Sequence, residues 1–289
     1  MSTLTDGASR GCSAGLRHRL GGYHEHHPIA ALGRFAESLW THVADPGQPA
    51  GMHRVLPDPA LNLALRCRRD PTGRPLDPRL VIIGPATRPF VFSFMPGDEI
   101  AAVRIKLEWA RPLLGLDPAE HLDRQDDVAD ANPRLALELT AALAGSVPAS
   151  RTAKGRMELL ATAMLERARR RAVESPGAAA YALDIVRAET GRVRVQAIAG
   201  RTSVSLRQLR RAVRREAVFS LKAYARIIRL NCAMASADRS PARAWARIAA
   251  EAGFCDQSHL VRECRALTGM SPEPVARERR AEDGGPAMP

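Results

Sequence analysis

The sequence predicts an α+β protein. We expect a β-rich N-terminal domain of barrel or sandwich type with peripheral helices, then a helical linker and an all-α C-terminal domain. Between about residues 53 and 107, apolar and polar side chains alternate with a period of two, as in half-buried strands. From about residue 152 onward, apolar side chains recur with the period of a helix. Because the chain has 289 residues, each domain can bury a core of its own.

Charge divides the chain in the same way. Residues 1–150 hold 16 Lys and Arg against 17 Asp and Glu, whereas residues 151–289 hold 27 against 14. Within residues 201–250 the count is 12 against 2. A basic half suits a polyphosphate partner, although a solvated Arg-rich surface would give the same composition.

The N-terminal strands are predicted from three alternating segments and one apolar run. The alternating apolar residues are Leu61, Leu63 and Leu65, then Phe90, Phe92 and Phe94, and then Val103, Ile105 and Leu107. The apolar run, residues 80–83, ends at a Gly-Pro turn. Apolar residues between Leu32 and Val43 are spaced as in a helix, although the end of this segment could become a strand.

Two helices are expected after these strands. Asn132 is a good N-cap and Pro133 suits the first helical position, so a helix should begin there and end near Gly145. A second helix should run from about Thr152 to Arg171, with three arginines at its negative C-terminal end.

These patterns divide the chain into five segments. They are a disordered N-terminus at 1–20, a β-rich sensor or assembly domain at 21–148, a helical linker at 149–176, a DNA-binding domain at 177–280 and a disordered tail at 281–289. Residues 175–177, Ser-Pro-Gly, are the best candidate for the connection between the domains. The helix of the linker could mediate a dimer or brace the C-terminal domain.

Several classes of protein are disfavoured. A run of ~18 apolar residues and a secretory signal are both absent, so we expect a cytoplasmic protein without membrane contact. The five cysteines form no C-x-x-C pair, which argues against a disulfide frame or a zinc site. His24, His26 and His27, with His53, could bind a metal, but an exposed His-rich segment is favoured, and neither a metal nor a cofactor is expected.

The first helix-turn-helix unit lies between residues 195 and 214. A short helix at 195–199 and a turn at 200–204 precede a helix capped by Ser205. Gln208 completes a capping box, and Val204 with Leu209 forms a hydrophobic staple. The outward residues of this helix are Arg207, Arg210, Arg211 and Arg214. At this spacing two or three guanidinium groups could enter a major groove and bind guanine edges, although a cationic surface helix would look similar.

The second unit lies between residues 244 and 272. Its supporting helix, 244–252, should end at a left-handed Gly253, and Asp256 should cap the recognition helix. The outward residues of that helix include Gln257, Ser258, His259, Arg262 and Arg265. One long helix at 221–235 joins the two units and would hold two recognition helices at grooves ~34 Å apart. Phosphate contacts are expected from Arg201, Lys222 and Arg265.

The segment from about 178 to 278 resembles the DNA-binding domain of the AraC/XylS family of bacterial transcription regulators. The matching strings are Ser205-x-Arg207-x-Leu209-x-Arg211, Gly253-Phe254-x-Asp256-Gln257-Ser258-His259-Leu260-x-Arg262 and Gly269-x-Ser271-Pro272. The resemblance implies that four arginines of the first recognition helix face DNA, and likewise Gln257, Ser258, His259 and Arg262 of the second.

The chain departs from the family at several positions. The family usually has Gly and Pro where this chain has Val218 and Leu221, and aromatic residues where it has Val213, Leu260 and Cys264. These changes keep the apolar character and reduce the volume of the core. We therefore expect them to affect helix stability and tilt more than function.

The N-terminal half resembles the uncharacterised β-rich domain that precedes this module in many regulators. The resemblance rests on Tyr23-x-x-x-x-Pro28, Trp40, Arg54-Val55-Leu56-Pro57-Asp58 and Gly84-Pro85. It implies a pocket for a small effector.

The sequence thus predicts a sequence-specific DNA-binding transcription regulator without catalytic residues. Double-stranded promoter DNA is the expected partner, and a small-molecule effector, RNA polymerase and a second copy of the chain are further candidates. Activation and repression both remain open. The alternative is a barrel enzyme or a DNA-repair protein whose basic C-terminal module only localises it to nucleic acid. A methyl-acceptor repair protein would need a cysteine cluster, and Cys12 and Cys67 are too few.

Overall fold

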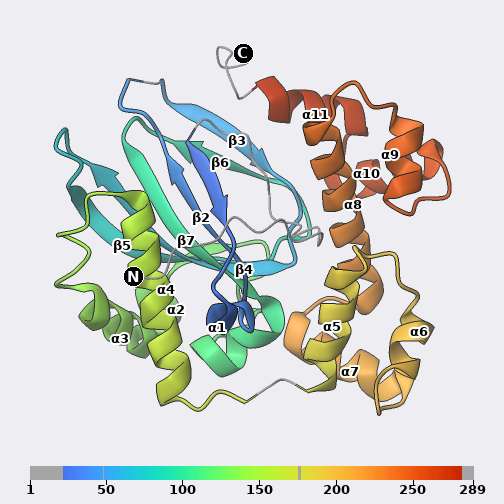
Figure 1. Ribbon diagram of the computed structural model, residues 1–289, viewed down its shortest axis with the longest axis horizontal. Coiled ribbons are helices and arrows are strands. Elements are labelled where there is room, and N and C mark those ends of the chain that lie inside the picture. Colours follow the sequence, from blue (N-terminus) through green and yellow to red (C-terminus); the bar gives the residue numbers. More distant parts are fainter. Residues whose placement is uncertain (1–21, 48, 175–176, 282–289) are drawn as a thin grey trace.

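The computed structural model describes residues 22–47, 49–174 and 177–281. Figure 1 shows a β-rich N-terminal half beside a helical C-terminal half, with the long helix α8 (Leu221–Arg239) standing between the sheet and the outer helices. The predicted fold class, α+β with an all-α C-terminal part, is confirmed. The expected disordered N-terminus, residues 175–176 of the expected linker and residues 282–289 of the expected tail lie outside the described residues.

The N-terminal half contains an antiparallel six-stranded sheet and a second sheet of two strands. The first has the order β1 (Tyr23–His26), β2 (Ala36–Val43), β7 (Asp98–Lys106), β4 (Ala60–Arg69), β5 (Pro75–Ile83), β8 (Gln125–Asp127). The second pairs β3 (Gly51–Val55) with β6 (Phe90–Phe94). Four of these strands, β4 to β7, were predicted from the alternating segments and the apolar run.

The central strand β4 is buried on both faces. Leu61, Leu63 and Leu65 belong to the main hydrophobic core, which also contains residues of the helices. On the opposite face Ala64 packs with Ile100 and with Phe92 of the small sheet. The small sheet therefore covers one face of the large sheet.

The helix suggested by the spacing between Leu32 and Val43 is wrong over most of its length. A four-residue helix, α1 (Ala30–Gly33), is followed by strand β2, so the alternative of a strand at the end of the segment is correct. β2 pairs with β1 on one side and β7 on the other, and both of its faces are largely buried. A strand buried on both faces has no polar alternation, which is why its apolar spacing resembled a helix.

Helices cover the other face of the large sheet. They are η1 (Leu107–Trp109), η2 (Ala110–Leu114), α2 (Val128–Ala131), α3 (Pro133–Leu143) and α4 (Ala153–Arg170). The predicted cap of α3 is confirmed, since Asn132 accepts a hydrogen bond of 3.1 Å from the backbone N–H of Leu135. α4 packs against β2 and β7, and its buried Arg156 donates to Glu99 of β7 at 2.5 Å.

The C-terminal half consists of seven helices among the described residues. They are α5 (Ala178–Ala188), α6 (Val195–Gly200), α7 (Leu206–Ala217), α8, α9 (Trp245–Glu251), α10 (Gln257–Thr268) and α11 (Pro272–Ala281). The capping box of α7 is present, and Asp256 caps α10 by accepting from the backbone N–H of His259 at 2.6 Å. Gly253 has the left-handed conformation, with a φ of +79°.

One core joins the sheet to the first helix-turn-helix unit. Leu209 and Val213 of α7 lie in the same buried cluster as residues of β4, β7 and α4. A second cluster contains Leu260 and Cys264 of α10 together with Leu230 of α8. Both units are therefore anchored on α8.

Val218 ends α7 in the left-handed conformation, with a φ of +60°. This is the position where the resemblance places a glycine. A β-branched side chain is strained in this region by about 1–3 kcal/mol, whereas glycine is not. The departure at Val218 therefore concerns backbone strain as well as core volume.

We expect Val218→Gly to raise the free energy of unfolding by about 1 kcal/mol, because the relief of strain exceeds the lost packing of a half-buried side chain. Denaturant unfolding of the full chain measures this. Val204→Gly is the matched control: Val204 is also half-buried and packs on the same core, but it does not have a positive φ, so this variant should be less stable. An equal loss of stability in both variants would contradict the account.

Candidate nucleic-acid interface

The outer face of α7 carries the first group of predicted DNA contacts. Leu209 and Val213 are buried, and this fixes the orientation of the helix. The side chains of Arg207, Arg210, Arg211 and Arg214 are all exposed on the opposite faces. Exposed guanidinium groups on a helix whose inner face is anchored can be presented to a major groove as a fixed set.

Three of these arginines line a basic hollow of about 950 Å³ between α6, α7 and the start of α8. The lining includes Arg210, Arg211, Arg214, Arg215 and Lys222. Ser220 caps α8 by accepting from the backbone N–H of Ala223 at 3.1 Å, and Lys222 follows in the first turn. A helix N-terminus among five basic side chains attracts an anion, and a DNA strand can lie along such a surface.

The outer face of α10 carries the second group. Gln257, Ser258 and Arg262 are exposed, as is Arg265. His259 is half-buried: its ring contacts Phe254 edge to face at 5.4 Å, and its Nδ1 accepts the backbone N–H of Cys255 at 3.3 Å. His259 thus also holds the turn before α10 in place.

The predicted phosphate contacts are less uniform. Lys222 and Arg265 are exposed, whereas the exposed Arg201 forms an ion pair with Glu189 in the loop after α5. A phosphate would have to compete with Glu189 for Arg201.

α8 sets the separation of the two units. Figure 1 shows α6 and α7 near one end of this helix and α9 and α10 near the other. Its 19 residues span about 28 Å at ~1.5 Å per residue, which is close to one turn of B-DNA.

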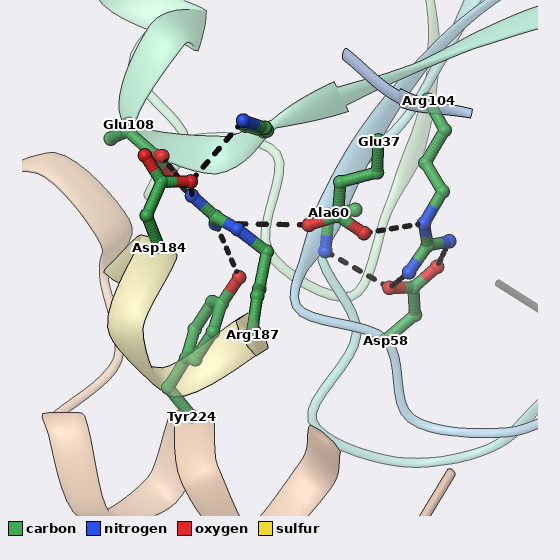
Figure 2. Close-up of polar contacts among 9 residues, drawn as sticks. Glu37, Asp58, Ala60, Arg104, Glu108, Asp184, Arg187 and Tyr224 are labelled. Carbon is green, nitrogen blue, oxygen red and sulfur yellow. Dashed lines mark hydrogen bonds and ion pairs between the residues drawn. The ribbon is translucent and has the colours of Figure 1, made fainter. Parts of the chain in front are cut away.

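An arginine whose side chain is only 12% exposed connects α5 to the sheet domain. Arg187 forms ion pairs with Glu108 of η1 and Asp184 of α5, and its Nη1 donates to the Tyr224 hydroxyl of α8 at 2.7 Å (Figure 2). Glu37 lies 3.7 Å from the same guanidinium group. Burial would lower the pKa of Arg187, but Glu108 and the neighbouring groups raise it well above its usual value, so the guanidinium remains charged.

The network continues into the sheet. Glu37 accepts from Nε of Arg104 on β7 at 3.0 Å, and Arg104 forms a two-pronged ion pair with Asp58 (Figure 2). Asp58 also accepts from the backbone N–H of Ala60 at 3.0 Å. Charged groups on β2, β7, η1 and α5, together with the Tyr224 hydroxyl of α8, are thereby linked across the boundary between the two halves.

The segment Arg54–Asp58 has two sides. Leu56 packs in the second cluster with α8 and α10, and the carbonyl of Pro57 accepts from Asn231 of α8 at 3.0 Å. Val55 and Asp58 face a cavity inside the sheet domain. Neighbouring residues of one short segment therefore touch the cavity and the helical C-terminal half.

Comparison with known families gives two matches. A helix-turn-helix domain family matches residues 198–278, and a domain of unknown function (DUF6597) matches residues 24–127.

The C-terminal part of the chain is an AraC-type helix-turn-helix domain.

With the β-rich domain before it, this makes the protein a DNA-binding transcription regulator. No curated protein matches the chain.

Solved structures of ToxT from Vibrio cholerae resemble the fold. The apo form from strain SCE256 is 12% identical over 83% of this chain and 97% of its own, with a TM-score of 0.41. The form from strain O395 bound to (E)-4-(8-methylnaphthalen-1-yl)but-3-enoic acid is 9% identical over 80% and 98%, with a TM-score of 0.43. At such values the likeness is one of fold alone.

Sequence reasoning missed the residues that hold the AraC-type domain in place. Arg104, which holds Glu37 of this network, stands between the apolar residues Val103 and Ile105 of a predicted strand. A polar residue in such a strand is a signal of a buried hydrogen-bonded group. The partners of Arg187 gave no comparable signal, because they come from distant parts of the chain.

Membrane-spanning helices and metal-binding groups are both absent from the described residues. Among the described residues, no helix combines the length and apolar character that crossing a bilayer requires. In the same part of the chain, no three His, Cys, Asp or Glu side chains are grouped so that they could hold a metal ion.

Replacing Arg187 by leucine should lower the free energy of unfolding by about 3–5 kcal/mol, because buried Glu108 loses its counter-charge, whereas Glu37 keeps Arg104. Arg247→Leu is the matched control, since Arg247 is exposed and its pair with Glu251 contributes at most about 1 kcal/mol. Denaturant unfolding compares the two variants. Equal small losses would contradict the proposed anchor.

The loss of stability in Arg187→Leu should depend on pH. Burial raises the pKa of Glu108, and Arg187 opposes this shift. Without Arg187 the folded protein should bind the Glu108 proton more tightly than the unfolded chain does. The deficit of Arg187→Leu should therefore be smallest below the usual glutamate pKa and should grow as the pH rises toward the raised value. A deficit independent of pH would show that Glu108 is not responsible.

Proposed function

We propose that this regulator reads two successive major grooves of promoter DNA, with α7 in one groove and α10 in the next. The observation that carries the proposal is the pairing of exposed side chains with buried anchors. Each recognition helix has an apolar inner face in a core, an outer face of groups that bind base edges, and a common support in α8. A merely cationic surface would not need the helices to be fixed in this way.

Different roles follow for the exposed residues. We assign base contacts to Arg207, Arg210, Arg211 and Arg214 of α7 and to Gln257, Ser258, His259 and Arg262 of α10. One arginine can form two hydrogen bonds with the edge of a guanine, and one glutamine can form two with the edge of an adenine. We assign phosphate contacts to Arg201, Lys222 and Arg265, with Arg201 exchanging Glu189 for a phosphate.

An effector bound in the N-terminal domain would modulate this activity. The support is the cavity beside Asp58 and the segment Arg54–Asp58, which contacts the cavity and α8 at once. Arg54 also reaches α11, where its Nε donates to Glu278 at 2.8 Å. A change at the cavity wall therefore has a direct mechanical route to the second unit.

Further partners follow from this role. A promoter-bound regulator can contact RNA polymerase, and a second copy of the chain could occupy an adjacent half-site. We propose both as partners, with the cytoplasm as the place of action. The domain limits 21–148, 149–176 and 177–280 also stay predictions, and α4 packs on the sheet rather than standing apart from it.

An enzyme localised by its basic module is the second candidate. A repair protein would need an activated thiol. Burial raises the pKa of Cys67 to about 11, so this thiol is protonated at neutral pH and is a poor nucleophile. This observation favours a regulator without catalytic activity.

Alanine variants separate base reading from charge attraction. Arg211→Ala and Arg262→Ala should each relax the preference at one position of the selected site, at a loss of ~1–3 kcal/mol. Arg201→Ala and Lys222→Ala should weaken binding to all sequences and reduce the salt slope by about one. Binding to selected and random DNA at several salt concentrations measures both effects.

Arg134→Ala is the control, because Arg134 is exposed on α3. The substitution removes the same charge, but α3 lies far from both units (Figure 1). It should change neither quantity. If all four interface variants weakened selected and random DNA equally, specific reading would be wrong and charge attraction would suffice.

A further inference from the structure

A cavity of about 60 Å³ lies between the six-stranded sheet and the β3–β6 sheet, within a hollow of about 640 Å³ that reaches solvent. A single water needs only ~10–15 Å³ of such space, so the cavity has room for a small ring rather than a long chain. Its walls are largely apolar and include Trp40, Phe90, Phe92, Val55 and Ile100. An apolar cavity with a few polar groups is the usual form of a small-molecule site.

The charged groups in the wall are already neutralised. Arg104 and Asp58 both line the cavity, and they bind each other in a two-pronged ion pair (Figure 2). The remaining Nε of Arg104 donates to Glu37 at 3.0 Å. A carboxylate ligand would therefore lose its hydration without meeting a cation that is not already paired, and a cationic ligand would find Asp58 engaged in the same way.

His42 supplies a polar group to the cavity wall. It is 2% exposed, and neither ring nitrogen has a hydrogen-bond partner among the described residues. Burial, and then His53, lowers the pKa of His42 to about 4, so the imidazole is neutral at physiological pH. A neutral imidazole can offer one donor and one acceptor. Leaving both unsatisfied is unfavourable, and a polar ligand would relieve this.

Asn62 supplies a second polar group to the cavity wall. Its Oδ1 accepts the indole N–H of Trp40 at 2.9 Å, which orients the carboxamide. The Nδ2 donor is then on the side of the carboxamide turned away from Trp40. A carboxamide held in this way can donate to a carbonyl oxygen of a ligand.

We propose that this cavity binds a small uncharged ring compound that carries a carbonyl or amide group, held by Asn62 and His42 against Trp40, Phe90 and Phe92. The aromatic walls stack on the ring, and the two polar side chains fix its orientation. The role of this compound as the effector rests on the proposed function. Its binding to the cavity does not depend on that function.

Three isosteric probes test the ligand class with the full chain: benzamide, benzoate and benzamidine are uncharged, anionic and cationic at neutral pH. We expect benzamide to bind at least about tenfold more tightly than either charged probe, because a charged group enters the cavity without a counter-ion. Titration calorimetry at millimolar probe concentration measures the three dissociation constants. Tighter binding of benzoate or benzamidine, or binding of none of the three, overturns the proposal.

Matched variants locate the site. Val55→Trp fills the cavity and should abolish benzamide binding. Val91→Trp is the control, because Val91 lies on the paired strand but is 52% exposed, and it should leave binding unchanged. Equal binding by both variants would place benzamide elsewhere and overturn the proposal.

A charge exchange gives an independent check. Asn62→Asp keeps an acceptor for the Trp40 N–H and adds a negative charge to the wall, so it should weaken benzamide and favour benzamidine by at least about tenfold relative to the parent chain. An unchanged preference would exclude Asn62 from the site and overturn the proposal.

A measurement of DNA binding in the absence of any probe distinguishes failure of the ligand proposal from failure of the proposed regulator function. If the protein selects DNA but does not bind benzamide, only the ligand class is wrong. If it binds benzamide but shows no preference among DNA sequences, the regulator proposal is wrong and the ligand site remains.

Discussion

The buried guanidinium group of Arg187 is the constraint on which the arrangement of the two halves depends. It comes from the first helix of the DNA-binding half and is held by Glu108 and Glu37 of the sheet domain and by Tyr224 of α8. A charge at this depth is tolerated only while its partners keep their geometry. Because Tyr224 lies on the helix that carries both recognition units, the position of α8 is tied to the sheet.

The same network reaches the cavity. Glu37 stands between Arg187 and Arg104 (Figure 2). Arg104 and Asp58 form part of the cavity wall. A ligand that shifts this wall therefore acts on a set of paired charges and on the segment that carries Leu56 and Pro57. Two contiguous physical routes connect the cavity to α8, and through them a ligand would bias the position of this helix.

Much of the fold was predictable because local chemistry determined it. The sequence predicted three helix starts from their capping residues, and each forms the expected cap. They are Asn132, Ser205 with Gln208, and Asp256. Strand β2 was not predictable, because a strand buried on both faces loses the alternation that distinguishes it from a helix.

The exposure of the predicted DNA contacts followed from their outward positions on capped helices, and all but the half-buried His259 are exposed. That they contact DNA stays a prediction. The cavity and the Arg187 network could not be identified. Glu37, Arg104 and Arg187 are widely separated in the sequence, and only the folded chain brings them together. Left-handed Val218 likewise could be located only from the backbone.

Selection of bound sites from a random pool of DNA by the purified full chain tests the central claim most directly. The account predicts enrichment of a site with two separate blocks of preferred bases, centred about 10–10.5 base pairs apart, one for α7 and one for α10. Enrichment of a single block, or no enrichment above the random pool, would contradict it.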